Sequence, residues 1–386
     1  MTPAHRSFRL GVPRSRTFSL AASLLAVAAL AACASGTPRP TPAPLPANIV
    51  QIGVGQAWTA KIPAVSFPLQ VNVLGSRVTL ASDDGTVLKL DAATGRELSR
   101  SSVGEPLAAG VGSDGRVDAV VTRANQVVAL EGGREIWRRK LKSQSYTAPL
   151  VAGGRVFILG ADRSLTAFDG SNGAELWHMT RPAEPLVLRQ AGVLLAVGDT
   201  LIAGLAGRLV GVDPDTGSVH WEAPVGTSRG TNDVERLVDL VGGVSRQGSE
   251  ICARSFQTAV GCVNADTGTL RWSKPANGAT GVAGDGELVF GAEADGKVLA
   301  WRAISGERAW INESLQWRVL SGPLVLGRSV IIGDSTGLVH MLSREDGSAL
   351  NRLTTDTSGV AATPVVAADT LVVVTRSGGV FGFVPE

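Results

Sequence analysis

Short apolar runs rich in β-branched residues and leucine recur along the chain, separated by polar turn sequences. The stretch 208–221 shows the pattern, because one apolar run ends at Asp213, Thr216 and Gly217 follow, and a second run leads to Trp221. Glycine readily adopts the positive φ of a tight turn, and an Asp side chain can accept hydrogen bonds from backbone amides two residues on. Each copy of the pattern therefore predicts a strand, a tight turn and another strand.

The skeleton Asp-x-x-Thr-Gly-x-x-x-Trp recurs, with substitutions, through most of the chain. Its Trp-type positions follow one another at intervals of 38 to 51 residues, at 58, 98, 137, 177, 221, 272, 310 and 350. The matching apolar runs, which we expect to be inner strands, lie at 86–91, 126–131, 164–169, 208–213, 258–264, 297–302, 338–343 and 379–383. A unit of about 40 residues with four short strands has the size of one propeller blade. The sequence therefore predicts an all-β, eight-bladed β-propeller of four-stranded antiparallel blades, with seven or nine blades as alternatives.

The two ends of the repeat region are offset. No inner run precedes Trp58, and no outer strand follows the run 379–383. We expect the segment 56–62 to supply the outer strand of the last blade, which would pair the two ends of the chain and remove a sheet edge. The Trp positions themselves are expected to pack between neighbouring blades. The repeat gives no account of Trp301, on an inner run, or of Trp317, in a connection.

Composition and charge narrow the class of protein. The length of 386 residues would ordinarily suggest two or three domains, but the repeat favours a single repetitive one. The net charge is +2, and the first 32 residues hold four arginines and no acid, so the rest of the chain is close to neutral. We find no run of Lys and Arg, which argues against a nucleic-acid partner.

The N-terminus has the features of a lipoprotein signal. A basic segment precedes the apolar run 18–30, which is shorter than the roughly 20 residues that span a bilayer. The run ends in Leu-Ala-Ala before Cys33, which matches a bacterial lipobox, so we expect residues 1–32 to be removed and Cys33 to be acylated. The alternative is an ordinary secretory signal with a chance Cys. Ala34 is not the Asp that retains many lipoproteins in the inner membrane, which favours the outer membrane.

The mature chain is then expected to have two parts. Residues 33–48 contain alternating prolines and small residues, which is typical of an extended, solvated tether. Residues 49–386 would form the propeller.

The repeat skeleton resembles that of pyrroloquinoline-quinone (PQQ) enzyme propellers. Together with the eight repeats and the lipobox, it resembles the BamB family, lipoprotein subunits of the outer-membrane β-barrel assembly (BAM) complex. Two local matches carry this further: Leu-x-Leu-Arg at 186–189, and Glu-Arg-Leu-x-Asp at 235–239. In the family these segments bind a periplasmic POTRA domain of BamA. The resemblance therefore implies a BamA-binding set of Leu186, Leu188, Arg189, Glu235, Arg236 and Asp239. Val241 stands where the family has a further acid.

The spacing of the repeats points to the same two segments without the family. The two longest intervals, 44 and 51 residues, are consecutive, and both segments lie in the added length. Each falls between the outer strand of one blade and the inner strand of the next, so both should lie on one face, where repeat proteins often carry binding sites. Leu186 and Leu188 could form an apolar ridge, with Arg189 as a forked donor. The alternatives are that the leucines belong to the strand core and that Asp239 is an ordinary solvated or turn acid.

Catalytic chemistry finds little support in the sequence. None of the four histidines is spaced with Cys or acidic residues as a metal or nucleophile set, and no calcium-loop spacing is present. Quinoprotein dehydrogenases generally have adjacent cysteines and calcium ligands, which we do not find. We therefore predict no catalytic residues, cofactor or metal. A propeller enzyme of PQQ type, or a ligand sensor in the periplasm, is the alternative, and an envelope adhesion scaffold is a third reading.

Cys252 and Cys262 lie symmetrically about Gln257, the expected tip of a hairpin. That register would place them opposite each other on adjacent strands, and in an oxidising periplasm they are expected to form a disulfide. Two buried thiols are the alternative.

The sequence therefore predicts a non-enzymatic scaffold that is lipid-anchored to the periplasmic face of the outer membrane. The resemblance to the BamB family further implies that it assists the insertion of β-barrel proteins by docking on BamA, alongside other BAM subunits. A second role, in which the disk contacts unfolded outer-membrane proteins, has no support in the sequence.

Overall fold

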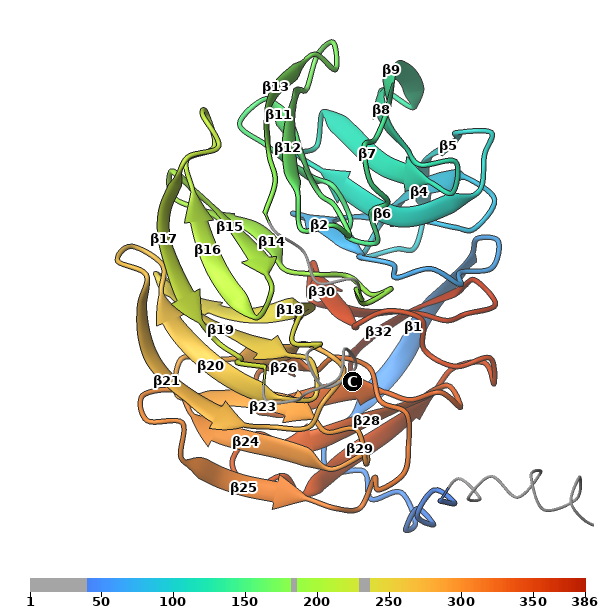
Figure 1. Ribbon diagram of the computed structural model, residues 1–386. Helices are drawn as coiled ribbons and strands as arrows, with labels where there is room; N and C mark the ends of the chain where they lie inside the picture. Colours follow the sequence, from blue (N-terminus) through green and yellow to red (C-terminus); the bar gives the residue numbers. More distant parts are fainter. Residues whose placement is uncertain (1–39, 182–185, 229–236) are drawn as a thin grey trace, which may run out of the picture. The chain divides into compact units, whose positions relative to one another are not determined.

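The computed structural model describes residues 40–181, 186–228 and 237–386. Contacts divide the chain into two units, 1–41 and 42–386, and the second contains all of the strands described here. In that unit 32 described strands form eight four-stranded sheets with antiparallel pairing. Figure 1 shows the sheets following one another in chain order around a common centre. The predicted eight-bladed β-propeller is confirmed.

Each blade runs from a central strand to a peripheral one. The first strands of neighbouring blades contact one another, as β2 does with β6 and β30, which places this strand nearest the centre. The innermost strands are β2 (Asn72–Leu74), β6 (Leu107–Ser113), β10 (Leu150–Ala152), β14 (Leu194–Val197), β18 (Leu240–Gln247), β22 (Val282–Gly284), β26 (Leu324–Leu326) and β30 (Val365–Ala367). The second strands are β3 (Arg77–Ala81), β7 (Val117–Thr122), β11 (Arg155–Leu159), β15 (Thr200–Leu205), β19 (Glu250–Ser255), β23 (Leu288–Ala292), β27 (Ser329–Gly333) and β31 (Thr370–Val374).

The apolar runs predicted as inner strands are the third strands of their blades. These are β4 (Thr86–Asp91), β8 (Gln126–Glu131), β12 (Leu165–Asp169), β16 (Arg208–Val212), β20 (Ala259–Asn264), β24 (Val298–Arg302), β28 (Leu338–Ser343) and β32 (Gly379–Pro385). The outer strands are β5 (Glu97–Ser102), β9 (Arg134–Lys140), β13 (Glu175–Met179), β17 (Val219–Pro224), β21 (Thr269–Pro275), β25 (Arg308–Asn312), β29 (Ala349–Thr354) and β1 (Val54–Lys61). The innermost strands escaped prediction because most are too short to show a periodic pattern.

The core lies between neighbouring sheets, so the middle strands are apolar on both faces. All six residues of β7 are buried, whereas five of the six residues of the peripheral β5 are exposed. A strand buried on both faces reads as a continuous apolar run rather than an alternating one, which is why the sequence pattern marked the third strands so clearly.

The ring is closed by the N-terminal strand. β1 pairs antiparallel with β32, from Val54 opposite Pro385 to Lys61 opposite Gly379, and completes the sheet β1-β32-β31-β30. The two strands lie side by side in Figure 1 although they come from opposite ends of the chain. The predicted closure of the last blade is confirmed, and β32 has a partner on both sides.

Residues before β1 also pack on the propeller. The Ala43 amide donates to the Gln316 carbonyl at 3.0 Å, and the Gln51 amide donates to the Leu350 carbonyl at 2.8 Å. The side chain of Asn48 donates to Asn351 Oδ1 at 3.0 Å. The packed part of the chain therefore begins at Ala43, earlier than the boundary at residue 49 that the proline pattern suggested.

In the six repeats that carry a tryptophan, this residue packs on the turn glycine of the next blade. At Gly217, where φ is +76°, an added Cβ would lie 2.7 Å from an atom of the Trp177 ring. The Trp177 indole N–H donates to the Pro214 carbonyl at 2.9 Å, and Asp213 accepts from the Thr216 amide at 2.9 Å. The same contact joins Trp58 to Gly95, Trp137 to Gly173, Trp221 to Gly268, Trp272 to Gly306 and Trp310 to Gly347.

The predicted cysteine hairpin has the expected register. Cys252 on β19 lies opposite Cys262 on β20, Gln257 lies in the turn between them with φ of 48°, and a disulfide joins the two cysteines. Both cysteines are buried and pack in one cluster with Trp272 and Trp301.

Candidate functional site

The two segments singled out in the sequence meet on one face of the propeller. Residues 186–193 precede β14, residues 237–239 precede β18, and each belongs to a connection between the outer strand of one blade and the innermost strand of the next. The Gly242 amide donates to the Ala191 carbonyl at 2.6 Å, and Gly192 forms an antiparallel bridge with Val241. The backbone therefore brings together segments that lie about 50 residues apart.

The side chain of Asp239 links the two segments through an ion pair and a hydrogen bond. Its Oδ1 accepts from Arg163 Nε at 3.2 Å and lies 3.1 Å from Arg163 Nη2, while its Oδ2 accepts from the Leu188 amide at 3.4 Å. The side chains of Arg163 and Asp239 are 5% and 18% exposed. Because its charge is already paired inside the protein, Asp239 presents little free negative charge. Its role in the geometry is to position Leu188.

Arg163 is itself held by the turn between β11 and β12, where its φ is 62°. The neighbouring Asp162 accepts from the hydroxyls of Ser143, at 2.7 Å, and Ser164, at 2.6 Å. Burial works to raise the pKa of the Asp162 carboxyl, but hydrogen bonds from Ser164 and Ser143 outweigh it, and the pKa lies below its ordinary value. The carboxylate stays ionised and keeps the turn that places Arg163 under Asp239.

The two leucines of the motif differ in exposure. Leu186 is 41% exposed, whereas Leu188 is half-buried and lines a small cavity of about 50 Å³ together with Tyr146, Arg163 and Asp239. The expected ridge therefore consists of one exposed leucine and one that is partly sunk into the surface.

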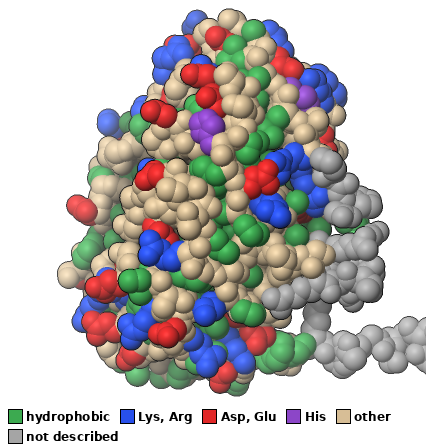
Figure 2. Space-filling model, turned by 60° about the vertical axis from the view of Figure 1, so that its left-hand side comes forward, with side chains coloured by type: hydrophobic (Ala, Val, Ile, Leu, Met, Phe, Trp, Pro, Cys, Tyr) green, Lys and Arg blue, Asp and Glu red, His purple; other side chains and the backbone are tan. Residues whose placement is uncertain are grey.

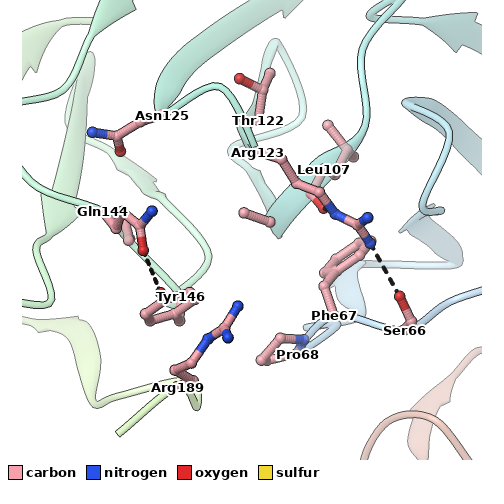
Figure 3. A pocket seen from close by; sticks show the side chains of 12 residues that line it. Ser66, Phe67, Pro68, Leu107, Thr122, Arg123, Asn125, Gln144, Tyr146 and Arg189 are labelled. Carbon is pink, nitrogen blue, oxygen red and sulfur yellow. Dashed lines mark hydrogen bonds between the residues drawn. The ribbon is translucent and has the colours of Figure 1, made fainter. Parts of the chain in front are cut away.

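Arg189 is exposed and rests on an aromatic ring. Its Cζ lies 5.5 Å from the centroid of Tyr146, and Figure 3 shows the two side chains side by side. A cation–π contact at an exposed site contributes about 0.5–1 kcal/mol, enough to bias the direction of the guanidinium while leaving it open to solvent.

We call Leu186, Leu188 and Arg189, with Asp239 and Arg163 beneath them, the docking surface. Sequence reasoning missed Arg163, which sits in an ordinary-looking turn, and Tyr146, whose only signal is that it is the single tyrosine of the chain. Val241 is 2% exposed, so this position adds no charge to the surface. Glu235, Arg236 and Cys33 lie outside the described residues.

Within the described ranges, no group of three or more His, Cys, Asp or Glu side chains is placed to hold a metal ion. No helix in these ranges is long and apolar enough to cross a membrane. In the view of Figure 2, acidic and basic side chains are interspersed rather than separated by sign, in keeping with the near-neutral propeller.

Eight stacked four-stranded sheets, closed by the first strand and joined by the repeated Trp–Gly contact, define a β-propeller of the PQQ-like repeat class. A family model described as outer membrane protein assembly factor BamB matches residues 83–312. An outer membrane protein assembly factor BamB from Burkholderia pseudomallei is 37% identical over 339 residues, covering 87% of this chain and 89% of the relative. The chain belongs to the BamB family.

Solved structures agree on the fold. BamB from Moraxella catarrhalis superposes with a TM-score of 0.78 at 24% identity, covering 86% of this chain and 99% of that one. The quinohemoprotein alcohol dehydrogenase ADHIIG from Pseudomonas putida HK5 gives a TM-score of 0.67 at 15% identity, covering 88% of this chain and 77% of that one. At these identities the likeness concerns the propeller alone.

Proposed function

We propose that the chain is a non-enzymatic scaffold subunit of the outer-membrane β-barrel assembly machinery, docking on a periplasmic POTRA domain of BamA. The name of the family, outer membrane protein assembly factor, supports a role in the assembly of outer-membrane proteins. One observation carries the choice of site: the segments around Leu188 and Asp239, both implicated by the family resemblance, are joined by a direct hydrogen bond.

The geometry of the docking surface suits a protein partner. Leu186 offers exposed apolar area, and Arg189 offers a planar fork of donors that matches a carboxylate. Both stand on a base fixed by the Asp239–Arg163 ion pair and by the backbone bridge between Gly192 and Val241. Because the surface is held in place before binding, little ordering free energy would be lost when a partner docks.

We also propose a lipid anchor at Cys33. Acylation of Cys33 would hold the chain on the periplasmic face of the outer membrane, with the proline-rich segment 33–48 as the tether between the lipid and the propeller. The docking surface would then orient the periplasmic arm of BamA beside other subunits of the complex. The fold likeness to a dehydrogenase gives no observation in favour of the enzyme alternative.

Co-purification from membranes tests the proposal. We expect wild-type chain to bring down BamA, and Leu186→Asp and Arg189→Glu to lose most of it, because each removes one contact of the docking surface. Leu176→Asp and Arg134→Glu are matched controls: both residues are exposed on outer strands, β13 and β9, and should retain BamA. BamA retained by both site variants would refute the site, and its absence with wild-type chain would refute the function.

A further inference from the structure

A cavity of about 540 Å³ opens beside the docking surface and shares Arg189 with it. Figure 3 shows its walls, which come from four connections of the chain and from the strands β6 and β7. Ser66, Phe67 and Pro68 precede β2, Arg123 lies in the turn after β7, and Tyr146 lies between β9 and β10. The volume falls within the roughly 300–1,000 Å³ that is typical of small-molecule binding sites. We call this cavity the side pocket.

The side pocket is positively charged. Two guanidinium groups, of Arg123 and Arg189, reach it, and its lining contains no Asp or Glu. Arg123 is oriented by two hydrogen bonds, from Nε to the Leu107 carbonyl and from Nη2 to Ser66 Oγ, both at 3.2 Å. Its side chain is 56% exposed, so the remaining edge of the guanidinium faces solvent. Arg123 Nη2 also forms a long ion pair of 3.8 Å with Asp83 Oδ1, a residue outside the lining, so Arg189 carries the less compensated charge of the two. An anionic group is therefore the matching ligand.

Two buried polar atoms in the lining make no hydrogen bond with the described residues: Thr122 Oγ1 and Asn125 Oδ1. Thr122 is only 1% exposed. Asn125 Nδ2 donates to the Leu141 carbonyl at 3.2 Å, which fixes the amide so that Oδ1 is the atom left over. A buried acceptor without a donor costs about 1–3 kcal/mol. Both atoms are closed off from solvent, so a ligand in the cavity would contact them only after the side chains around them shift.

These atoms decide the kind of anion. A phosphate offers mainly acceptor oxygens, which would face the acceptor Asn125 Oδ1 unfavourably. A peptide offers an N–H for Asn125 Oδ1 and a carbonyl for the Thr122 hydroxyl, and an acidic side chain on it offers a carboxylate for Arg123. The apolar side chains of Phe67 and Pro68 then suit a neighbouring apolar residue. We propose that the side pocket binds an extended acidic peptide segment of a partner protein.

The test uses a dye-labelled, terminally blocked hexapeptide of alternating aspartate and leucine, followed by fluorescence anisotropy with the full chain. We expect Arg123→Glu to weaken binding at least tenfold, and Thr122→Val to weaken it about threefold by removing only the hydroxyl. Arg134→Glu makes the same charge change on the outer strand of the same blade and should leave binding unchanged. Thermal melts establish that each variant is folded, and Arg123→Gln gives a milder variant with the same expected direction.

Two further arms identify the ligand chemistry. Replacing aspartate by asparagine in the peptide should abolish binding, and inorganic phosphate should fail to displace the peptide at equal concentration. Equal binding by Arg123→Glu, equal binding of the asparagine peptide, or displacement by phosphate would each overturn the proposal. None of these readings involves BamA, so the side pocket can fail while the docking surface stands, and the reverse.

Discussion

The contact between Gly217 and Trp177 shows how one residue of the repeat fixes the next blade. The turn needs a positive φ at Gly217, which glycine adopts most readily, and the indole ring of Trp177 occupies the space where a side chain would begin. The ring also donates to the Pro214 carbonyl in the same turn. One tryptophan therefore packs against the glycine of the neighbouring blade and also donates a hydrogen bond to the backbone of the same turn.

We expect Gly217→Ala to lower the free energy of unfolding by about 2–4 kcal/mol, the sum of backbone strain and overpacking against Trp177. Gly198, in a turn of the same blade, is the matched control. Its φ of 54° is also positive, but nothing lies within 4 Å of an added Cβ, so Gly198→Ala should cost only about 1 kcal/mol. Urea denaturation of both variants measures the difference. Equal losses would show that the tryptophan contact adds nothing.

The environment of Trp301 could not be predicted from the sequence. The repeat does not explain it, yet in the structure it is 3% exposed and lies 5.8 Å from Cζ of Arg254, which is fully buried. Burial lowers the pKa of Arg254, and the charge and hydrogen bond of Glu293, at 2.9 Å, act against this. These partners come from neighbouring blades, so no local pattern in the sequence announces them.

The β19–β20 hairpin shows how much an element can be derived from sequence. The symmetry of two cysteines about Gln257 is sufficient to set the register, because residues at equal distance from a hairpin tip face each other across the strands. The contacts made by the long connections before β14 and β18 could not be derived in this way. Repeat spacing located the added length around Leu188 and Asp239, but the ion pair with Arg163 depends on a turn in another blade.

We expect labelling of denatured, unreduced protein from the cell envelope to find neither Cys252 nor Cys262 reactive. The double substitution of both cysteines by alanine should lower the free energy of unfolding by about 2–4 kcal/mol, because the unfolded chain loses its cross-link. Mass spectrometry of the labelled protein gives the count. Two labelled thiols would contradict the disulfide.

At the scale of the whole molecule, closure converts eight similar sheets into one rigid support. β1 pairs with β32, so the first and last parts of the propeller are held in the same sheet. The eight-fold repeat and its closure were predictable because each blade repeats one local pattern. The location of the packed N-terminal segment and the joining of the docking surface were not, since both depend on contacts across blades.

We propose that this rigid ring presents Arg189 and its neighbours to BamA. The direct measurement is a binding titration of the purified periplasmic region of BamA with the full chain and two charge-reversal variants. We expect Arg189→Glu to raise the Kd at least tenfold, about 1.4 kcal/mol, and Arg134→Glu to stay within twofold of wild type. Wild-type affinity for Arg189→Glu, or equal weakening by both variants, would contradict it.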